Sequence, residues 1–209
     1  SDEYSLTLGT AASGDNLLDT LTFDNGTDSV AEDTFIGGII DAQDIRTSPT
    51  LVDGGQTVTV EGTVTVVSGS DVVAQDDGAP ENSGLLFFSS SLASAVSRDD
   101  LIRVTGQTSS FDQGGSLRYQ IGSPQLISAS PSTPVSPTTV SEGDFAFDET
   151  DGSDPAEQYE GVLITISDLI YDQGLSFGEH AFTKNSTEVH TDDVFFDQSG
   201  LYTANGVYT

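Results

Sequence analysis

The feature that most constrains the fold is the run over residues 57–67, which reads TVTVEGTVTVV. Valines at every second position, with polar residues between them, indicate a strand with one buried and one exposed face. Gly62 interrupts this run, so we expect a bulge or a sharp bend at that point. Shorter runs of similar composition follow, separated by the Gly, Ser, Asp and Asn residues that favour turns.

The chain is therefore predicted to be all-β, with little helix. The run over residues 159–170 (YEGVLITISDLI) is the most strand-like of the second half, and its residues 161–167 look equivalent to the opening strand at 58–66. Residues 92–96 read as a single helical turn. The other strands that we expect lie at residues 85–89, 101–105, 116–121, 125–128, 180–183, 194–196 and 201–208.

Five short segments occur in an order typical of one known family. Residues 55–65 read GQTVTVEGTVT, residues 84–88 read GLLFF, and residues 99–106 read DDLIRVTG. After the Pro-rich stretch SPSTPVSP (130–137), residues 157–166 read EQYEGVLITI and residues 177–179 read FGE. The run from about 43 to 170 thereby resembles the OB-fold accessory modules of secreted bacterial and archaeal nucleases.

The resemblance implies a partly open, five-stranded Greek-key barrel and a second β unit after it. We expect an N-terminal extension with strand-like segments at 1–42, an OB-like barrel at 43–130, a Pro/Ser linker at 131–139 and the second unit at 140–209. The resemblance does not imply nuclease activity. In such nucleases the catalysis belongs to a separate metallophosphoesterase-type domain, of which this sequence shows no part.

Charge is the strongest constraint on function. The chain has 34 acidic and 5 basic residues, Lys184 is its one lysine, and its formal net charge is -29. Such a surface repels phosphate backbones and anionic lipids. Its self-repulsion is screened in concentrated salt, since the Debye length falls to roughly 3 Å at 1 M. We therefore expect adaptation to high salt; a calcium-loaded extracellular protein is the alternative.

Acidic loops are the candidate calcium sites. Residues 147–154 read FDETDGSD and place Asp148, Asp151 and Asp154 around a glycine. Calcium takes six to eight oxygen ligands at flexible spacing, and a glycine lets a loop fold around the ion. Two loops with fewer acidic residues are weaker candidates: one contains Asp76 and Asp77, and the other spans residues 24–28. For each loop, the simpler interpretation is a solvated acidic turn of a salt-adapted protein.

Catalytic signatures are missing from the sequence, and we predict no enzyme. The chain has no Cys and no GxSxG, HExxH, P-loop or GxGxxG pattern. His180 and His190, with Asp192 and Asp193, could hold a metal, but two surface histidines are the simpler interpretation.

Nucleic-acid binding would need aromatic platforms beside a basic groove. The residues that could form such a face are Arg103, Arg118, Phe87, Phe88, Phe111 and Tyr119. Five basic residues cannot neutralise a phosphate stripe, so we do not expect direct nucleic-acid binding.

The sequence favours an exported protein at or outside the cell surface. It contains no Met, so we expect that a signal peptide preceded Ser1, and it has no run of 18 apolar residues that could span a membrane. The leading hypothesis is a non-catalytic structural module, a self-assembling subunit of a surface layer or fibre, in which residues 1–42 add a strand to a neighbour's sheet edge. The alternatives are an accessory module of a secreted nuclease and a cation-dependent adhesin.

Overall fold

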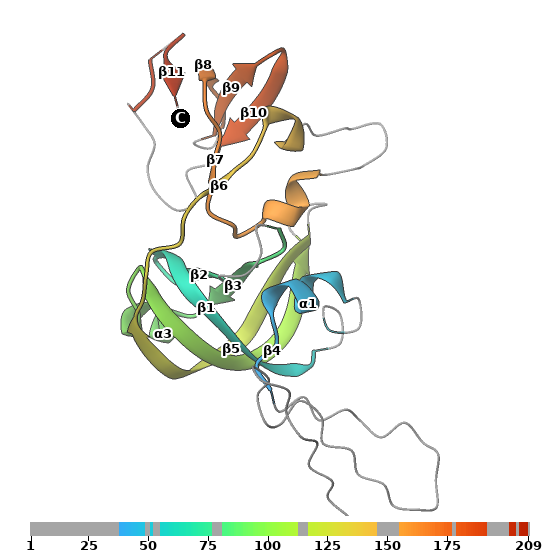
Figure 1. Ribbon diagram of the computed structural model, residues 1–209, viewed down its shortest axis with the longest axis vertical. Helices are drawn as coiled ribbons and strands as arrows, with labels where there is room; N and C mark the ends of the chain where they lie inside the picture. The colour runs from blue at the N-terminus through green and yellow to red at the C-terminus, as the bar shows by residue number, and fades with distance from the viewer. Residues whose placement is uncertain are drawn as a thin grey trace, which may run out of the picture.

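The computed structural model describes residues 38–48, 51, 55–76, 81–112, 117–145, 155–176, 179–191, 201–203 and 205–208, with side chains except at 111, 112, 117 and 118. These residues form two β units, a barrel and a smaller sheet (Figure 1). The prediction of an all-β chain is confirmed. Most of the extension (residues 1–37) and the expected strand at 194–196 lie outside the described residues.

Five strands form a closed barrel in the order β1-β2-β3-β5-β4. Their bounds are β1 Thr57–Ser68, β2 Asp71–Gln75, β3 Gly84–Phe88, β4 Asp100–Asp112 and β5 Leu117–Pro131. Neighbouring strands are antiparallel except β3 and β5, which are parallel. We expected a partly open barrel; the short parallel ladder from Leu86↔Gln120 to Phe87↔Ile121 closes it instead.

The alternation over residues 57–67 correctly predicts β1, but the bulge is displaced. The register shifts between Val64 and Val66 rather than at Gly62. Gly62 instead allows β1 to lie close to β2, since a Cβ at this position would lie 3.2 Å from the backbone of Gln75. β2 itself was not expected, because its residues Val72, Val73 and Ala74 are buried in succession and show no alternation.

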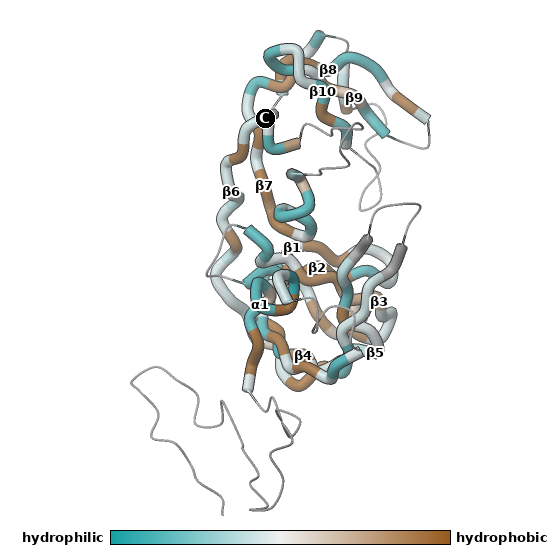
Figure 2. The backbone as a smooth tube through the Cα atoms, turned by 90° about the vertical axis from the view of Figure 1, so that its right-hand side faces the viewer, coloured by the Kyte–Doolittle hydropathy of each residue, from teal (hydrophilic) through white to brown (hydrophobic). Residues whose placement is uncertain are grey.

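The apolar side chains of the barrel strands converge on one core, and Figure 2 shows the apolar stretches following these strands. Two short helices pack against this core, α1 Ala42–Thr47 through Ile45 and α3 Ser90–Ala95 through Leu92. The predicted helical turn at residues 92–96 corresponds to α3. The Ser89 hydroxyl caps α3 by accepting a hydrogen bond from the backbone N–H of Leu92 at 3.2 Å. α1 was not expected.

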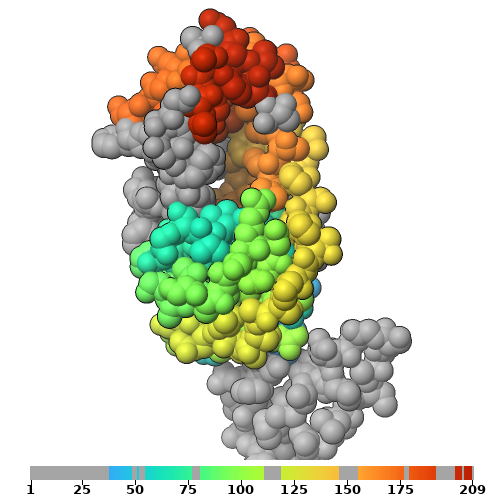
Figure 3. Space-filling model, turned by 90° about the vertical axis from the view of Figure 1, so that its left-hand side faces the viewer, coloured from blue at the N-terminus to red at the C-terminus, as the bar shows by residue number. Residues whose placement is uncertain are grey.

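The second unit has a core of its own around Phe182 and Val189. Its sheet has the order β10-β9-β8-β11, and a separate two-stranded sheet pairs β6 with β7. The bounds are β6 Thr138–Thr139, β7 Ile164–Thr165, β8 Leu169–Gly174, β9 His180–Lys184, β10 Thr187–Thr191 and β11 Val207–Tyr208, with 3-10 helices η1 Glu142–Phe145 and η2 Pro155–Tyr159. Residues 132–137 connect the two units along the outside of the molecule (Figure 3).

The prediction of one strand over residues 159–170 is wrong. η2 ends at Tyr159, and only Ile164–Thr165 and the start of β8 are strands in this run. Gly161 (φ +72°) and Asp168 (φ 60°) leave the extended region of backbone conformations and so break the strand. Residues 161–167 are therefore not the opening strand of a second, barrel-like unit.

No helix in the described part of the chain has the length and apolarity needed to cross a membrane.

A candidate binding site between the barrel and residues 155–163

The register of β1, β2 and β3 sets the outer face of the barrel on which the site lies. Paired residues of antiparallel strands point to the same side of a sheet, and successive residues alternate. Because Val72 and Ala74 point into the barrel core, their neighbours point outward. The register then gives three outward rows across β1, β2 and β3: Thr63–Gln75–Gly84, Val66–Val73–Leu86 and Ser68–Asp71–Phe88.

Residues 160–163 cover the first of these rows. The backbone N–H of Leu163 donates to the side-chain carbonyl of Gln75 at 2.9 Å. Gly84 lies so close to this segment that a Cβ on it would overlap the carbonyl oxygen of Glu160 and would lie 2.6 Å from the Cα of Gly161. Only a glycine at position 84 allows this approach of two backbones.

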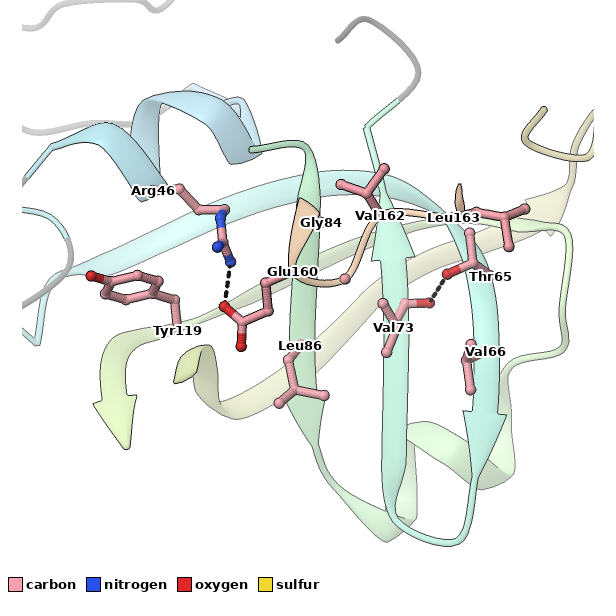
Figure 4. A pocket seen from close by; sticks show the side chains of 11 residues that line it. Arg46, Thr65, Val66, Val73, Gly84, Leu86, Tyr119, Glu160, Val162 and Leu163 are labelled. Atoms are coloured by element: carbon pink, nitrogen blue, oxygen red, sulfur yellow. Dashed lines mark hydrogen bonds and ion pairs between the residues drawn. The ribbon is translucent and has the colours of Figure 1, made fainter. Parts of the chain in front are cut away.

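Arg46 holds the same segment from the side. It lies in the last turn of α1, and its side chain is only 2% exposed. Nη1 donates to Oε2 of Glu160 at 2.8 Å (Figure 4). Nη2 donates to the backbone carbonyl of Glu157 at 2.7 Å and to its carboxylate at 3.3 Å. The Tyr119 ring of β5 lies 5.2 Å from the guanidinium carbon, a distance at which a cation–π contact forms. Arg46 therefore joins the helix, the barrel and η2.

The middle row remains partly open and forms the floor of a cavity of about 230 Å³. Val66, Val73 and Leu86 line the floor, and the covering segment contributes Val162 and Leu163 (Figure 4). The Arg46–Glu160 ion pair and Tyr119 lie at one end. An apolar cavity with a few polar groups at one end is the usual form of a small-molecule site.

The residues predicted to bind calcium are mostly outside the described part of the chain. This applies to Asp77, Asp148, Asp151 and Asp154. Asp76 directly follows β2, and its backbone N–H donates to the carbonyl of Ser83 at 3.0 Å. Within the described residues, no group of three or more His, Asp or Glu side chains could hold a metal ion. Calcium binding by the acidic loops stays a prediction.

The structure does not bring the two histidines together. His180 pairs with Thr191 and His190 pairs with Ala181, so the two rings point to opposite faces of the sheet. His180 lies 3.4 Å from the hydroxyl of Tyr171, and His190 lies 2.6 Å from the carboxylate of Glu188. Asp192 and Asp193 lie outside the described residues.

The residues considered for a nucleic-acid face do not form one surface. Phe87 is 1% exposed in the barrel core, whereas Phe88 is 66% exposed on the third outward row. Tyr119 contacts Arg46, and Arg103 pairs with Glu61 at 2.7 Å. The side chains of Phe111 and Arg118 are not among those that the structure describes. Each basic side chain that is described has a carboxylate partner: Arg46, Arg98, Arg103 and Lys184.

Glu142 is a second polar centre, in the smaller unit. Asn185 donates to its carboxylate at 2.6 Å, and Lys184 lies 3.4 Å away. The hydrogen bond from Asn185, followed by weaker contributions that include the charge of Lys184, lowers the pKa of Glu142 below 4.5. The carboxylate therefore contributes stability that is complete above the unfolded pKa and is lost as the pH falls through the folded pKa.

We expect Asn185→Gly to reduce this pH-dependent stability. Glycine suits the positive φ of 50° at this turn and removes only the side-chain donor. Denaturant midpoints of the wild type and the variant, measured from about pH 6 down to about pH 3, should differ most above pH 4.5 and converge in acid. A difference that stays constant across this range would show that Asn185 does not act through the Glu142 carboxylate.

The described residues thus form a two-unit β module in which one chain segment is seated on the barrel beside an apolar cavity. Comparison of the chain with known protein families, curated proteins and solved structures finds no match. Sequence reasoning did not find Arg46, Glu160 or the Gly84–Gly161 contact. The available signal was weak: an arginine among acidic residues, and a glycine next to Glu160 inside an apolar run.

Proposed function

We propose that this chain is a non-catalytic extracellular structural module, built on an OB-fold barrel, that assembles end to end in high salt. The observation that carries this proposal is the placement of two features at opposite ends. The chain enters the barrel at residues 38–40, at the end away from the second unit, and the four-stranded sheet lies at the other end (Figure 1). A strand from residues 1–37 of one copy, added to the sheet of the next, would give a head-to-tail contact, and such contacts build a filament when the rotation between copies does not close a ring.

Three features support the OB-fold assignment. The strand order is β1-β2-β3-β5-β4, the barrel closes through a parallel β3–β5 ladder, and α3 lies in the connection between β3 and β4. OB-folds bind oligonucleotides and oligosaccharides on the face of their second and third strands. Residues 160–163 cover part of that face here, which favours a structural role over polymer binding on it.

Strand edges favour self-association. Among the described strands, β10 has β9 as its only neighbour, so one row of its backbone groups faces away from the sheet. Such an edge is a template for an added strand. The barrel itself shows the same kind of pairing: residues 57–62 pair with β4 on one side, and on the other Ile39 forms a parallel bridge to Thr59. Ile39 is thus paired with a barrel strand at the point where the chain enters the barrel.

The seated segment ties the start of the second unit to the barrel. Arg46, Gln75 and Gly84 fix residues 157–163 on the barrel, and β7 and β8 follow directly. A rigid connection suits a load-bearing subunit. The excess of carboxylates suits concentrated salt, because ions screen the repulsion between copies that carry a charge of -29 each.

Deletion of residues 1–14 tests the proposal. We expect the full chain to form filaments or sheets at about 2 M salt, and we expect the deleted chain to remain a folded monomer, as seen by negative-stain microscopy, light scattering and circular dichroism. A chain with residues 1–14 in scrambled order is the matched control for length and charge, and it should also fail to assemble. Assembly that persists unchanged after the deletion would refute strand donation by this segment.

A further inference from the structure

We propose that the cavity between the barrel and residues 160–163 binds a small primary amine, with its apolar body over Val66, Val73 and Leu86 and its ammonium group on Glu160. This site is independent of self-assembly. The cavity volume is about 230 Å³. A cavity of about 150 Å³ holds benzene, and pockets for drug-sized ligands start at roughly 300 Å³. The volume therefore suits one ring, or a branched chain of that size, with a short linker.

The walls are suited to an apolar body. The floor consists of Val66, Val73 and Leu86, and the covering segment adds Val162 and Leu163. Hydrogen bonds hold both the strands and the covering segment in place. A ring between these walls loses contact with water on both sides, which is the driving force for apolar binding. Tyr119 adds an aromatic face near the polar end.

The charges at the polar end favour a cation. One guanidinium, Arg46, is paired with two carboxylates, Glu157 and Glu160, which leaves one net negative charge. Oε2 of Glu160 accepts from Arg46, and among the described residues Oε1 has no hydrogen-bond partner. The other carboxylate oxygen points away from Arg46 in Figure 4. The Glu160 side chain is 26% exposed, so an incoming ammonium can reach it.

An anionic ligand is disfavoured at the same place. A carboxylate would be a third negative group beside Glu157 and Glu160, in a chain whose net charge is -29. A neutral alcohol of the same shape would keep the apolar contacts and donate one hydrogen bond, but it would lose the ion pair. Hydrogen bonds to charged groups are stronger when both partners are charged. The order of affinity should therefore be ammonium, alcohol, carboxylate.

Three ligands with the same phenyl ring test this order: 2-phenylethylammonium, 2-phenylethanol and 3-phenylpropionate. Each is titrated into the full chain by calorimetry or ligand-observed NMR at about 2 M salt, where the Debye length is below about 3 Å and unspecific attraction of cations to the acidic surface is screened. We expect the ammonium to bind at least roughly tenfold more tightly than either comparator. Equal or tighter binding of the alcohol or the carboxylate, or no binding of the ammonium, would overturn the proposal.

Two variants locate the site. Val66→Phe fills the floor of the cavity and should abolish binding. Val67 is exposed and does not line the cavity, so Val67→Phe should leave binding unchanged. Glu160→Gln should weaken binding of the ammonium roughly tenfold and leave binding of the alcohol unchanged. Circular dichroism checks that each variant is folded. A folded Val66→Phe or Glu160→Gln chain that binds the ammonium like the wild type would contradict the assignment.

Discussion

Replacement of Gly84 by alanine should lower the free energy of unfolding by about 3 kcal/mol, the upper part of the range for an overpacked site. The added Cβ would overlap the carbonyl oxygen of Glu160 and would lie 2.6 Å from the Cα of Gly161. Both are backbone atoms, so they cannot move aside as a flexible side chain can. The covering segment would have to lift from the barrel and lose the Leu163–Gln75 hydrogen bond.

Gly122→Ala is the matched control, in another strand of the same barrel. A Cβ at Gly122 would meet nothing closer than 3.5 Å, which is ordinary van der Waals contact. Alanine in a strand also restricts the unfolded chain more than glycine does, so this variant should be neutral or slightly stabilising. Denaturant unfolding of both variants at constant high salt makes the comparison. Equal destabilisation of the two would mean that the contact at Gly84 is not tight.

Arg46→Met should have the second-largest effect and lower the free energy of unfolding by about 2–3 kcal/mol. Removal of one partner from a buried ion pair typically costs about 3–5 kcal/mol, and the partial exposure of Glu157 and Glu160 reduces this figure. The variant keeps most of the side-chain volume but removes the Arg46 hydrogen bonds to both carboxylates and to the carbonyl of Glu157. The effect should persist at high salt, because the guanidinium is only 2% exposed.

Arg103→Met is the control for this substitution. Arg103 also pairs with a carboxylate, Glu61, at 2.7 Å, but its side chain is 41% exposed. Pairs of this kind contribute less than about 1 kcal/mol and are weakened by salt. Midpoints for both variants should be measured at two salt concentrations. If Arg46→Met costs no more than Arg103→Met, Arg46 does not hold the two units together.

Local patterns predicted four of the five barrel strands and missed β2. The alternation of valines with polar residues gives β1 directly, and apolar runs between turn residues give β3, β4 and β5, although β4 and β5 are longer than expected. The closure of the barrel could not be predicted from local sequence patterns. It depends on a parallel ladder of only two residue pairs between β3 and β5, and strand pairing at that distance leaves no local pattern in either strand.

The second half was predicted less well for a physical reason. An apolar run such as residues 159–170 can form a strand or can cover another surface, and periodicity does not distinguish the two. Here Gly161 adopts a positive φ and passes over Gly84, so the run covers the barrel. The Arg46–Glu160 pair joins positions 114 residues apart, which no local pattern reveals.

The most direct test of end-to-end assembly is the mass of the purified full chain by light scattering at about 2 M salt, over a wide range of protein concentration. We predict a mass that grows with concentration beyond that of any small closed oligomer, since a head-to-tail contact that does not close adds copies without limit. The mass of one chain at every concentration would contradict self-assembly and would favour an accessory module of a larger secreted protein.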